Sequence, residues 1–192
     1  MSGPTLILAS ASPRRLSLLE QIAVVPDQII PADIDETPEK GERPPDYVQR
    51  VSLAKARTIA ADNDGHFILA ADTAVACGRR ILPKAEDVKT AKECLALLSG
   101  RAHRVYSAVA LISPAGLETN RVVETRVKVR PLNAQMIAEY VASDEWDGKA
   151  GGYAIQGLFS KHIVSIVGSH PNVVGLPLYE TWNLLVGAGW RQ

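Results

Sequence analysis

A short apolar segment that runs straight into a helix start is the feature that most limits how this chain can fold. Residues 5–9 have the composition of a buried β-strand. Ser12 can cap a helix, Pro13 suits a first turn, and apolar side chains then recur at helical spacing up to Ile22. Strand and helix patterns mix along the rest of the chain, without a repeat or a low-complexity segment. The sequence therefore predicts an α/β fold.

The first half of the chain holds the patterns of further helices and strands around one long loop. The loop is acidic and rich in proline, a composition that favours irregular structure. We expect this loop over residues 31–45, a helix from Asp46, a strand over residues 66–77, a return strand at Ile81–Leu82, and a helix from about Ala85 to residue 100 with Glu86 and Asp87 in its first turn.

The second half is predicted to be more antiparallel. Two β-rich runs, at residues 104–113 and 121–130, are separated by a turn sequence, which suggests a long hairpin. Asn133 can cap a helix, residues 143–157 form a long loop, and a strand and a last helix follow. No linker separates independent domains, and 192 residues with 46% hydrophobic content suffice for one well-packed core. We expect a single domain over residues 1–192, with two lobes.

Composition limits the classes of function. Lysine plus arginine balance aspartate plus glutamate at 21 each, so the chain has no bulk positive field for a nucleic-acid backbone, and any anion site must be local. Cys77 and Cys94 are too few for a secreted disulfide framework, which fits a reducing cytoplasm. The N-terminal apolar run is too short to span a membrane. We therefore expect a soluble, cytoplasmic protein without nucleic-acid or membrane partners.

The passage from the first strand into the first helix resembles a phosphate-binding loop in its physical chemistry. Its small residues let an anion approach the backbone, and the helix N-terminus points toward that position. Arg14 and Arg15 add positive charge to an end that is already positive, which makes sense if both bind phosphate. The alternative is an ordinary helix start with two solvated arginines.

An aspartate after a buried strand is the second indication of a functional site. Asp72 follows five apolar residues, and a carboxylate placed there is costly unless it is paired, binds a metal or takes part in chemistry. A turn-capping aspartate is the alternative. Three acidic residues of the long loop could provide a ligand for a divalent cation, or simply face water: Asp33, Asp35 and Glu36.

As a set, these motifs resemble the Maf family of nucleoside triphosphate pyrophosphatases. The resemblance runs from about Leu6 to Thr181, and it rests on "ASASPRR", "AKAR", "ADT", "LPKAED", "SGRAHRVYSAVAL", "KAGGYAIQG" and "GLPLYET". It implies hydrolysis of a nucleoside triphosphate to the monophosphate and pyrophosphate with a divalent metal, Mg²⁺ or Mn²⁺. It also implies a mixed, strongly twisted sheet with flanking helices and two lobes around a deep cleft, similar to the inosine triphosphate pyrophosphatase fold.

The resemblance assigns a role to individual positions of this chain. It implies that the triphosphate binds Ser10, Arg14 and Arg15, that Lys55 and Lys84 are lysines of the cleft, that Asp72 is the general base and a metal ligand, and that Glu36 is a second metal ligand. The sequence departs from the usual family pattern at three positions: Ala85 replaces a proline, Gly148 an aspartate, and Ser107 a threonine.

Gln156 stands where the family branch acting on dTTP and UTP has glutamine, so the resemblance favours pyrimidine nucleotides. An amide offers both a donor and an acceptor to a base edge, and we expect it to be buried against that edge. One alternative is a structural amide that ties down its loop. A broad preference, or a preference for 7-methyl-GTP, is another alternative.

A different class of function also fits the basic residues. A nucleotide-binding regulator of cell division would need the arginines and lysines to hold about four negative charges of a triphosphate, but only hydrolysis needs Asp72. The cellular role, whether nucleotide-pool control, removal of damaged nucleotides or division control, stays open. So does the oligomeric state, for which a homodimer is one option.

Overall fold

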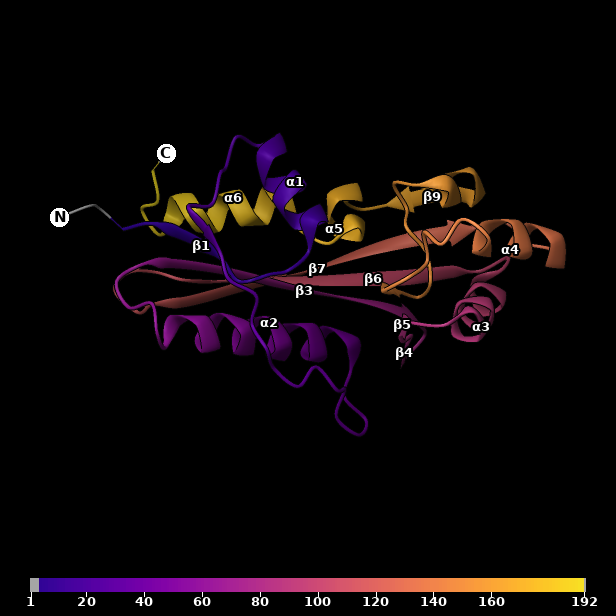
Figure 1. Ribbon diagram of the computed structural model, residues 1–192, viewed down its shortest axis with the longest axis horizontal. Coiled ribbons are helices and arrows are strands. Elements are labelled where there is room, and N and C mark those ends of the chain that lie inside the picture. The colour runs from indigo at the N-terminus through magenta and orange to yellow at the C-terminus, as the bar shows by residue number, and fades with distance from the viewer. Residues whose placement is uncertain (1–3, 192) are drawn as a thin grey trace. The chain divides into compact units, whose positions relative to one another are not determined.

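The computed structural model describes residues 4–191 and divides them into two compact units. Unit 1 comprises residues 4–72, Ser107–Val123 and 175–191, and unit 2 comprises Thr73–Tyr106 and Glu124–Val174. The central sheet has the strand order β2-β1-β3-β6-β7-β9, and β4 pairs with β3 (Figure 1). The sheet mixes parallel and antiparallel pairs and carries helices, so the predicted α/β fold with a mixed sheet is confirmed.

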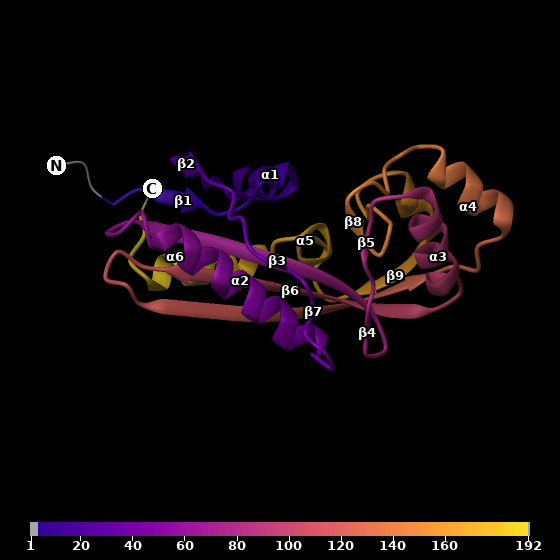
Figure 2. The same cartoon turned by 60° about the horizontal axis from the view of Figure 1, so that its bottom comes forward.

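Unit 1 is built on parallel strands. The strand β1 (Leu6–Leu8) pairs in parallel with β2 (Gln28–Ile29) and with β3 (Phe67–Cys77), so that Leu6 lies opposite Phe67. The helix α2 (Pro44–Ala60) lies on one side of these strands, and α1 (Pro13–Gln21) and α6 (Leu178–Gly187) lie on the other (Figures 1 and 2). Parallel strands buried on both faces explain why β1 and the first part of β3 are continuously apolar.

Unit 2 has antiparallel pairs. Its elements are β4 (Arg80–Ile81), which pairs with the end of β3; β5 (Lys84–Ala85), which pairs with β8 (Lys149–Ala150); β9 (Ile163–Val167), which pairs with β7 (Glu118–Val129); and the helices α3 (Val88–Leu98), α4 (Ala134–Val141), η1 (Leu158–His162) and α5 (His170–Val174). The strand β6 (Ala102–Ile112), like β3 and β7, contributes residues to both units.

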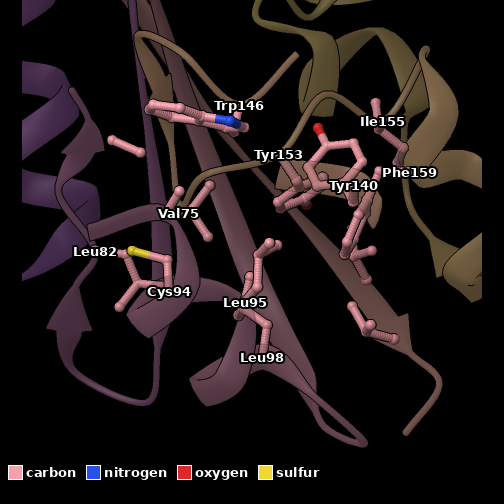
Figure 3. Packing of buried hydrophobic residues seen from close by; sticks show 14 of the residues in the cluster. Val75, Leu82, Cys94, Leu95, Leu98, Tyr140, Trp146, Tyr153, Ile155 and Phe159 are labelled. Carbon is pink, nitrogen blue, oxygen red and sulfur yellow. The ribbon is translucent and has the colours of Figure 1, made fainter. Parts of the chain in front are cut away.

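The core of unit 2 is partly aromatic. Tyr140, Tyr153 and Phe159 pack with ring centroids 4.8 to 5.0 Å apart, while Leu95 and Leu98 come from α3 (Figure 3). The Tyr140 hydroxyl accepts a hydrogen bond from the backbone N–H of Ala154, which holds the 143–157 loop against this core. Contacts of this kind explain how a glycine-containing loop keeps a defined conformation.

Several expected boundaries are wrong by a few residues. The second helix begins at Pro44, not at Asp46, because proline is well accommodated at a helix start. The third helix begins at Val88, not at about Ala85, and Asp87 is its N-cap residue rather than part of its first turn. The Asp87 carboxylate accepts from Thr90 N–H at 2.8 Å, while Ala85 pairs with Lys149 in β5 and β8.

Three local expectations can be compared with the structure directly. Asn133 caps α4 as predicted, since its side chain accepts from Met136 N–H. Ser12 is the N-cap residue of α1, as predicted, but its side chain makes no capping hydrogen bond. Asp72 lies inside β3, which continues to Cys77 as the strand expected over residues 66–77 implies, so it does not follow the end of the strand. Within residues 4–191, no helix combines the length and hydropathy that a membrane span requires. The single domain over 1–192 and the deep cleft stay predictions.

Candidate active site

Arg15 and Ser10 form the first part of the candidate site, at the junction of β1 and α1 in unit 1. Arg15 Nη1 donates to Ser10 Oγ at 3.0 Å, and Arg15 Nε donates to the carbonyl oxygen of Gly175 at 2.9 Å. Ser10 is buried, and its hydroxyl also accepts from Ser12 N–H at 3.2 Å. The guanidinium of Arg15 is therefore held in one orientation rather than solvated.

Burial makes the charges of both arginines costly. Desolvation lowers the pKa of Arg15 most, and the neighbouring charge of Arg14 lowers it further, while the carboxylates of Asp72 and Glu36 raise it. Desolvation also lowers the pKa of Arg14. Both arginines are half-buried and lie at a helix N-terminus, so they concentrate positive charge in a chain of zero net charge, an arrangement that suits an anion.

A buried lysine between two carboxylates forms the second part. Lys55 Nζ lies 2.9 Å from Asp72 Oδ1 and 2.7 Å from Glu36 Oε1. The Lys55 and Asp72 side chains are 8% and 5% exposed, and Glu36 is 28% exposed, so the contact is largely shielded from water. The helix α2 provides Lys55, the strand β3 provides Asp72, and the proline-rich loop provides Glu36.

Asp72 retains one oxygen without a partner. Its Oδ2 is buried and accepts no hydrogen bond from any residue that the structure describes. Burial raises the pKa of Asp72 above the ordinary aspartate value, while the charges of Lys55 and Arg15 act in the opposite direction. The turn-capping alternative does not fit, because Asp72 lies within a strand and bonds to Lys55. A buried acceptor of this kind is costly unless a ligand completes it.

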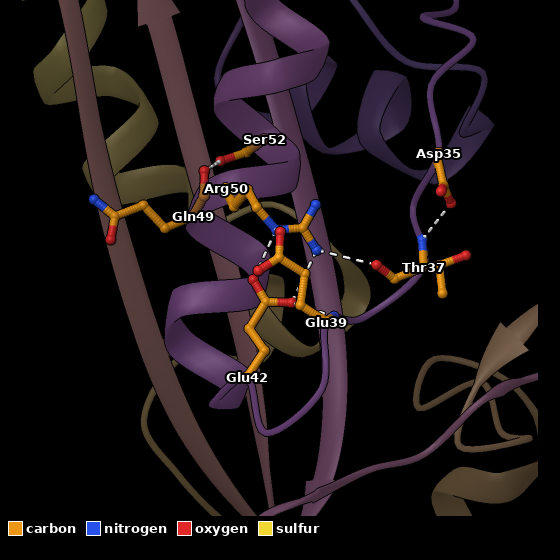
Figure 4. A network of polar contacts seen from close by, with 7 residues as sticks. All are labelled: Asp35, Thr37, Glu39, Glu42, Gln49, Arg50 and Ser52. Atoms are coloured by element: carbon orange, nitrogen blue, oxygen red, sulfur yellow. Dashed lines mark hydrogen bonds and ion pairs between the residues drawn. The ribbon is translucent and has the colours of Figure 1, made fainter.

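The loop before α2 is held mainly by Arg50 and Glu42, to which the sequence assigned no role. Arg50 on α2 bonds to Glu42 and to the Thr37 carbonyl, and the Asp35 carboxylate accepts from Thr37 N–H (Figure 4). Tyr47 lies beneath the Arg50 guanidinium on the same helix. The spacing of Tyr47 and Arg50, three residues apart on a helix, is a signal that could have indicated this cluster.

Lys84 and Gln156 belong to unit 2, unlike the other predicted site residues. Lys84 is exposed and lies in β5 opposite Ala150. Gln156 is also exposed. The expected burial of the Gln156 amide against a base edge refers to the bound nucleotide, so it stays a prediction, as does the alternative of an amide that ties down its loop.

The carboxylates of Glu36 and Asp72 are the candidate ligands for a divalent cation. Among the described residues, no group of three or more histidine, cysteine, aspartate or glutamate side chains forms a ready metal site. Mg²⁺, however, commonly uses only one or two carboxylates together with substrate phosphates and water. Such a site fits the two carboxylates of Glu36 and Asp72, because Asp72 Oδ2 has no partner among the described residues.

A protein-family model described as Maf-like protein matches residues 5–188. The chain belongs to the Maf family. This Maf chain is 58% identical to the dTTP/UTP pyrophosphatase of Rhodospirillum rubrum over 99% of its own length and 90% of that protein. It is 56% identical to the dTTP/UTP pyrophosphatase of Caulobacter vibrioides over 99% of its own length and 98% of that protein.

A solved structure with a similar fold is that of a HAM1 protein from Coxiella burnetii. The similarity has a TM-score of 0.51 at 19% sequence identity, and covers 96% of the Maf chain and 99% of the HAM1 chain. At this identity the similarity concerns the fold alone. It agrees with the mixed α/β architecture of the Maf chain.

Proposed function

We propose that this protein hydrolyses nucleoside triphosphates to the monophosphate and pyrophosphate, with dTTP and UTP as preferred substrates. The substrate class is supported by the names of relatives that are 58% and 56% identical over nearly the whole chain. The structural observation that carries hydrolysis is the buried Asp72, which has one oxygen bonded to Lys55 and one without a partner.

Each part of the site has a separate task in this proposal. Arg14, Arg15 and Ser10 hold the phosphates, because they gather positive charge and donors at the N-terminus of α1. Asp72 orients the attacking water for displacement between the α and β phosphates. Burial raises the pKa of Asp72 and the charge of Lys55 lowers it, so Lys55 favours the ionised carboxylate that would accept a hydrogen bond from that water.

A divalent cation, Mg²⁺ or Mn²⁺, is part of the proposal. Glu36 and Asp72 would hold it, and when bound it would neutralise charge that develops on the phosphates. Lys84 and Gln156 are proposed to contact the leaving phosphates and the base respectively. A cytoplasmic location, a homodimer and a role in nucleotide-pool control stay predictions.

The alternative is a regulator that binds triphosphates without turning them over. It would use the same arginines, but it would have no use for a buried carboxylate with an unpartnered oxygen. Pyrophosphate release from dTTP, UTP, dCTP, dATP, GTP and 7-methyl-GTP, measured with Mn²⁺ or Mg²⁺, distinguishes the two. Binding of dTTP without any pyrophosphate release would overturn the proposed hydrolysis and favour the regulator.

A further inference from the structure

Arg50 connects α2 to the loop that carries Glu36. Its Nε and Nη2 donate to the two Glu42 oxygens at 2.7 and 2.8 Å, and Nη2 also donates to the Thr37 carbonyl oxygen at 3.1 Å (Figure 4). These contacts span eight and thirteen residues of chain, so they fix the loop at two points. A lysine could not make this paired contact, because only a guanidinium offers parallel donors.

The Arg50–Glu42 pair is more than an ordinary surface ion pair. The Glu42 side chain is only 8% exposed, and the Arg50 guanidinium lies 5.7 Å from the Tyr47 ring centroid. The hydrogen bond from Arg50 lowers the pKa of Glu42, so the pair is fully ionised at neutral pH. Shielding from water and stacking on an aromatic ring both strengthen such a pair relative to a solvated one.

Thr37, whose carbonyl group Arg50 binds, is the neighbour in sequence of Glu36, a candidate metal ligand. Thr37 follows Glu36 in the chain, its carbonyl accepts from Arg50, and its N–H donates to Asp35 Oδ1 at 2.8 Å. The backbone is thus fixed on both sides of the Thr37 side chain. The carboxylate of Glu36 then reaches Lys55 Nζ at 2.7 Å, and Lys55 lies on the same helix as Arg50.

We propose that Arg50 is a positioning residue that holds the Glu36 carboxylate beside Lys55 and Asp72, and thereby sets the affinity of the site for its divalent cation. The inference rests on the proposed function, because it assumes that Glu36 is a metal ligand. Groups that orient a ligand from behind typically change metal affinity by about 10- to 100-fold when they are removed. Without the contacts of Arg50 the loop would also have to become ordered when the cation binds, and this loss of conformational entropy would weaken binding.

The chain offers a matched control on the same helix. Arg57 makes an equivalent two-bond contact with Glu118, at 2.9 and 2.7 Å, away from the Glu36 loop. Arg50→Met and Arg57→Met therefore each remove a two-bond pair from α2. The Arg57 pair is more exposed to water, and only Arg50→Met removes an anchor of the loop. Binding of Mn²⁺ is measured from the electron paramagnetic resonance signal of the free ion, without nucleotide and therefore without turnover.

We expect Arg50→Met to weaken Mn²⁺ binding about tenfold or more, and to raise the Mn²⁺ concentration for half-maximal pyrophosphate release by a similar factor. Arg57→Met should leave both values unchanged. In a Glu36→Gln background, Arg50→Met should have little further effect, because the carboxylate that it positions is already absent. Arg50→Lys retains the positive charge and serves as a second variant in case Arg50→Met does not fold. It should also bind Mn²⁺ more weakly than the wild type.

Three results would overturn the inference: no Mn²⁺ binding by the wild type, wild-type Mn²⁺ affinity in Arg50→Met, or equal losses from Arg50→Met with and without Glu36→Gln. Failure of the proposed function looks different. In that case the wild-type protein releases no pyrophosphate, whereas the Mn²⁺ affinities of the variants are still measured independently of hydrolysis.

Discussion

The ammonium nitrogen of Lys55 lies 2.9 Å from Oδ1 of Asp72, and both side chains are almost completely buried. Removal of Lys55 would leave the buried Asp72 carboxylate without its paired charge, whereas removal of Asp72 would leave Lys55 paired with Glu36 alone. The pair leaves Asp72 Oδ2 without a partner among the described residues. A carboxylate oxygen that is available for a ligand can orient or deprotonate the water that attacks a phosphoanhydride.

We expect Asp72→Asn to lower pyrophosphate release from dTTP by at least about 100-fold, because an amide neither accepts a proton nor binds a cation well. Triphosphate binding, measured by calorimetry, should persist, since the arginines are unchanged. Chelation with EDTA should reproduce the loss in the wild type. Turnover that EDTA does not diminish would contradict a metal-assisted mechanism.

Replacement of either arginine by lysine should lower kcat/KM for dTTP beyond what the retained charge would suggest. In Arg15→Lys, the contacts with Ser10 Oγ and the Gly175 carbonyl cannot both form, and a loss of about ten- to a hundredfold is expected. Arg14→Lys should also lose activity, and the thermal midpoints should show that both variants fold. Wild-type turnover in both variants would mean that these guanidinium groups do not bind the phosphates.

The preference among bases is expected to place dTTP and UTP above dATP, GTP and 7-methyl-GTP by about ten- to a hundredfold. Gln156→Glu should reduce this preference, because a carboxylate lacks the amide donor and adds a negative charge. Since Gln156 is exposed without substrate, its replacement should leave the free energy of unfolding nearly unchanged. An unchanged ranking across the nucleotides would place base selection on other residues.

Stability should depend on pH through His103. This histidine is buried in unit 2 and bonds to the Tyr153 hydroxyl, and burial lowers its pKa from 6.5 to about 4. The unfolded chain therefore binds the proton more readily, so the stabilising contribution is complete above about pH 6.5 and declines as the pH falls toward 4. The decline amounts to at most about 3 kcal/mol.

The measurement is urea unfolding of the wild type and of His103→Gln at pH 7 and pH 5. The variant should be less stable at pH 7 but should lose less stability between the two values. His170→Gln, which changes an exposed histidine, is the control and should follow the wild type. Identical pH dependence in His103→Gln and the wild type would contradict the role of His103.

Gly151 should resist substitution for two separate reasons. Its φ is +69°, which costs an L-residue about 1 kcal/mol, and an added Cβ would lie 2.8 Å from Val75 Cγ1. Gly148 has a similar φ of +64° but open space around its Cβ position. Gly148→Ala should therefore cost about 1 kcal/mol, and Gly151→Ala about 1–3 kcal/mol more, in urea unfolding. Equal losses would show that Val75 moves aside without cost.

Much of the local structure could be predicted from the order of residues. The strand at residues 5–9, the helix that begins at Pro13 and the Asn133 cap depend on apolar spacing and on side chains within a few positions of each other. The predicted starts of α2 and α3 differ by a few residues from the observed starts at Pro44 and Val88. Near each start, more than one residue is suited to the first helical position or to the N-cap. The site residues were predicted from the passage between the first strand and the first helix, from Asp72 and from the resemblance to the Maf family, and their roles stay predictions.

The tertiary structure alone decided which of those groups meet. Lys55 and Asp72 are 17 positions apart, and Arg15 and the Gly175 carbonyl are 160 apart, so neither contact leaves a periodic signal in the sequence. The exposure of Gln156, and the absence of a described partner for Asp72 Oδ2, likewise depend on how strands and loops pack. Local patterns are determined by neighbouring residues, whereas burial and distant pairing arise only when the whole chain is folded.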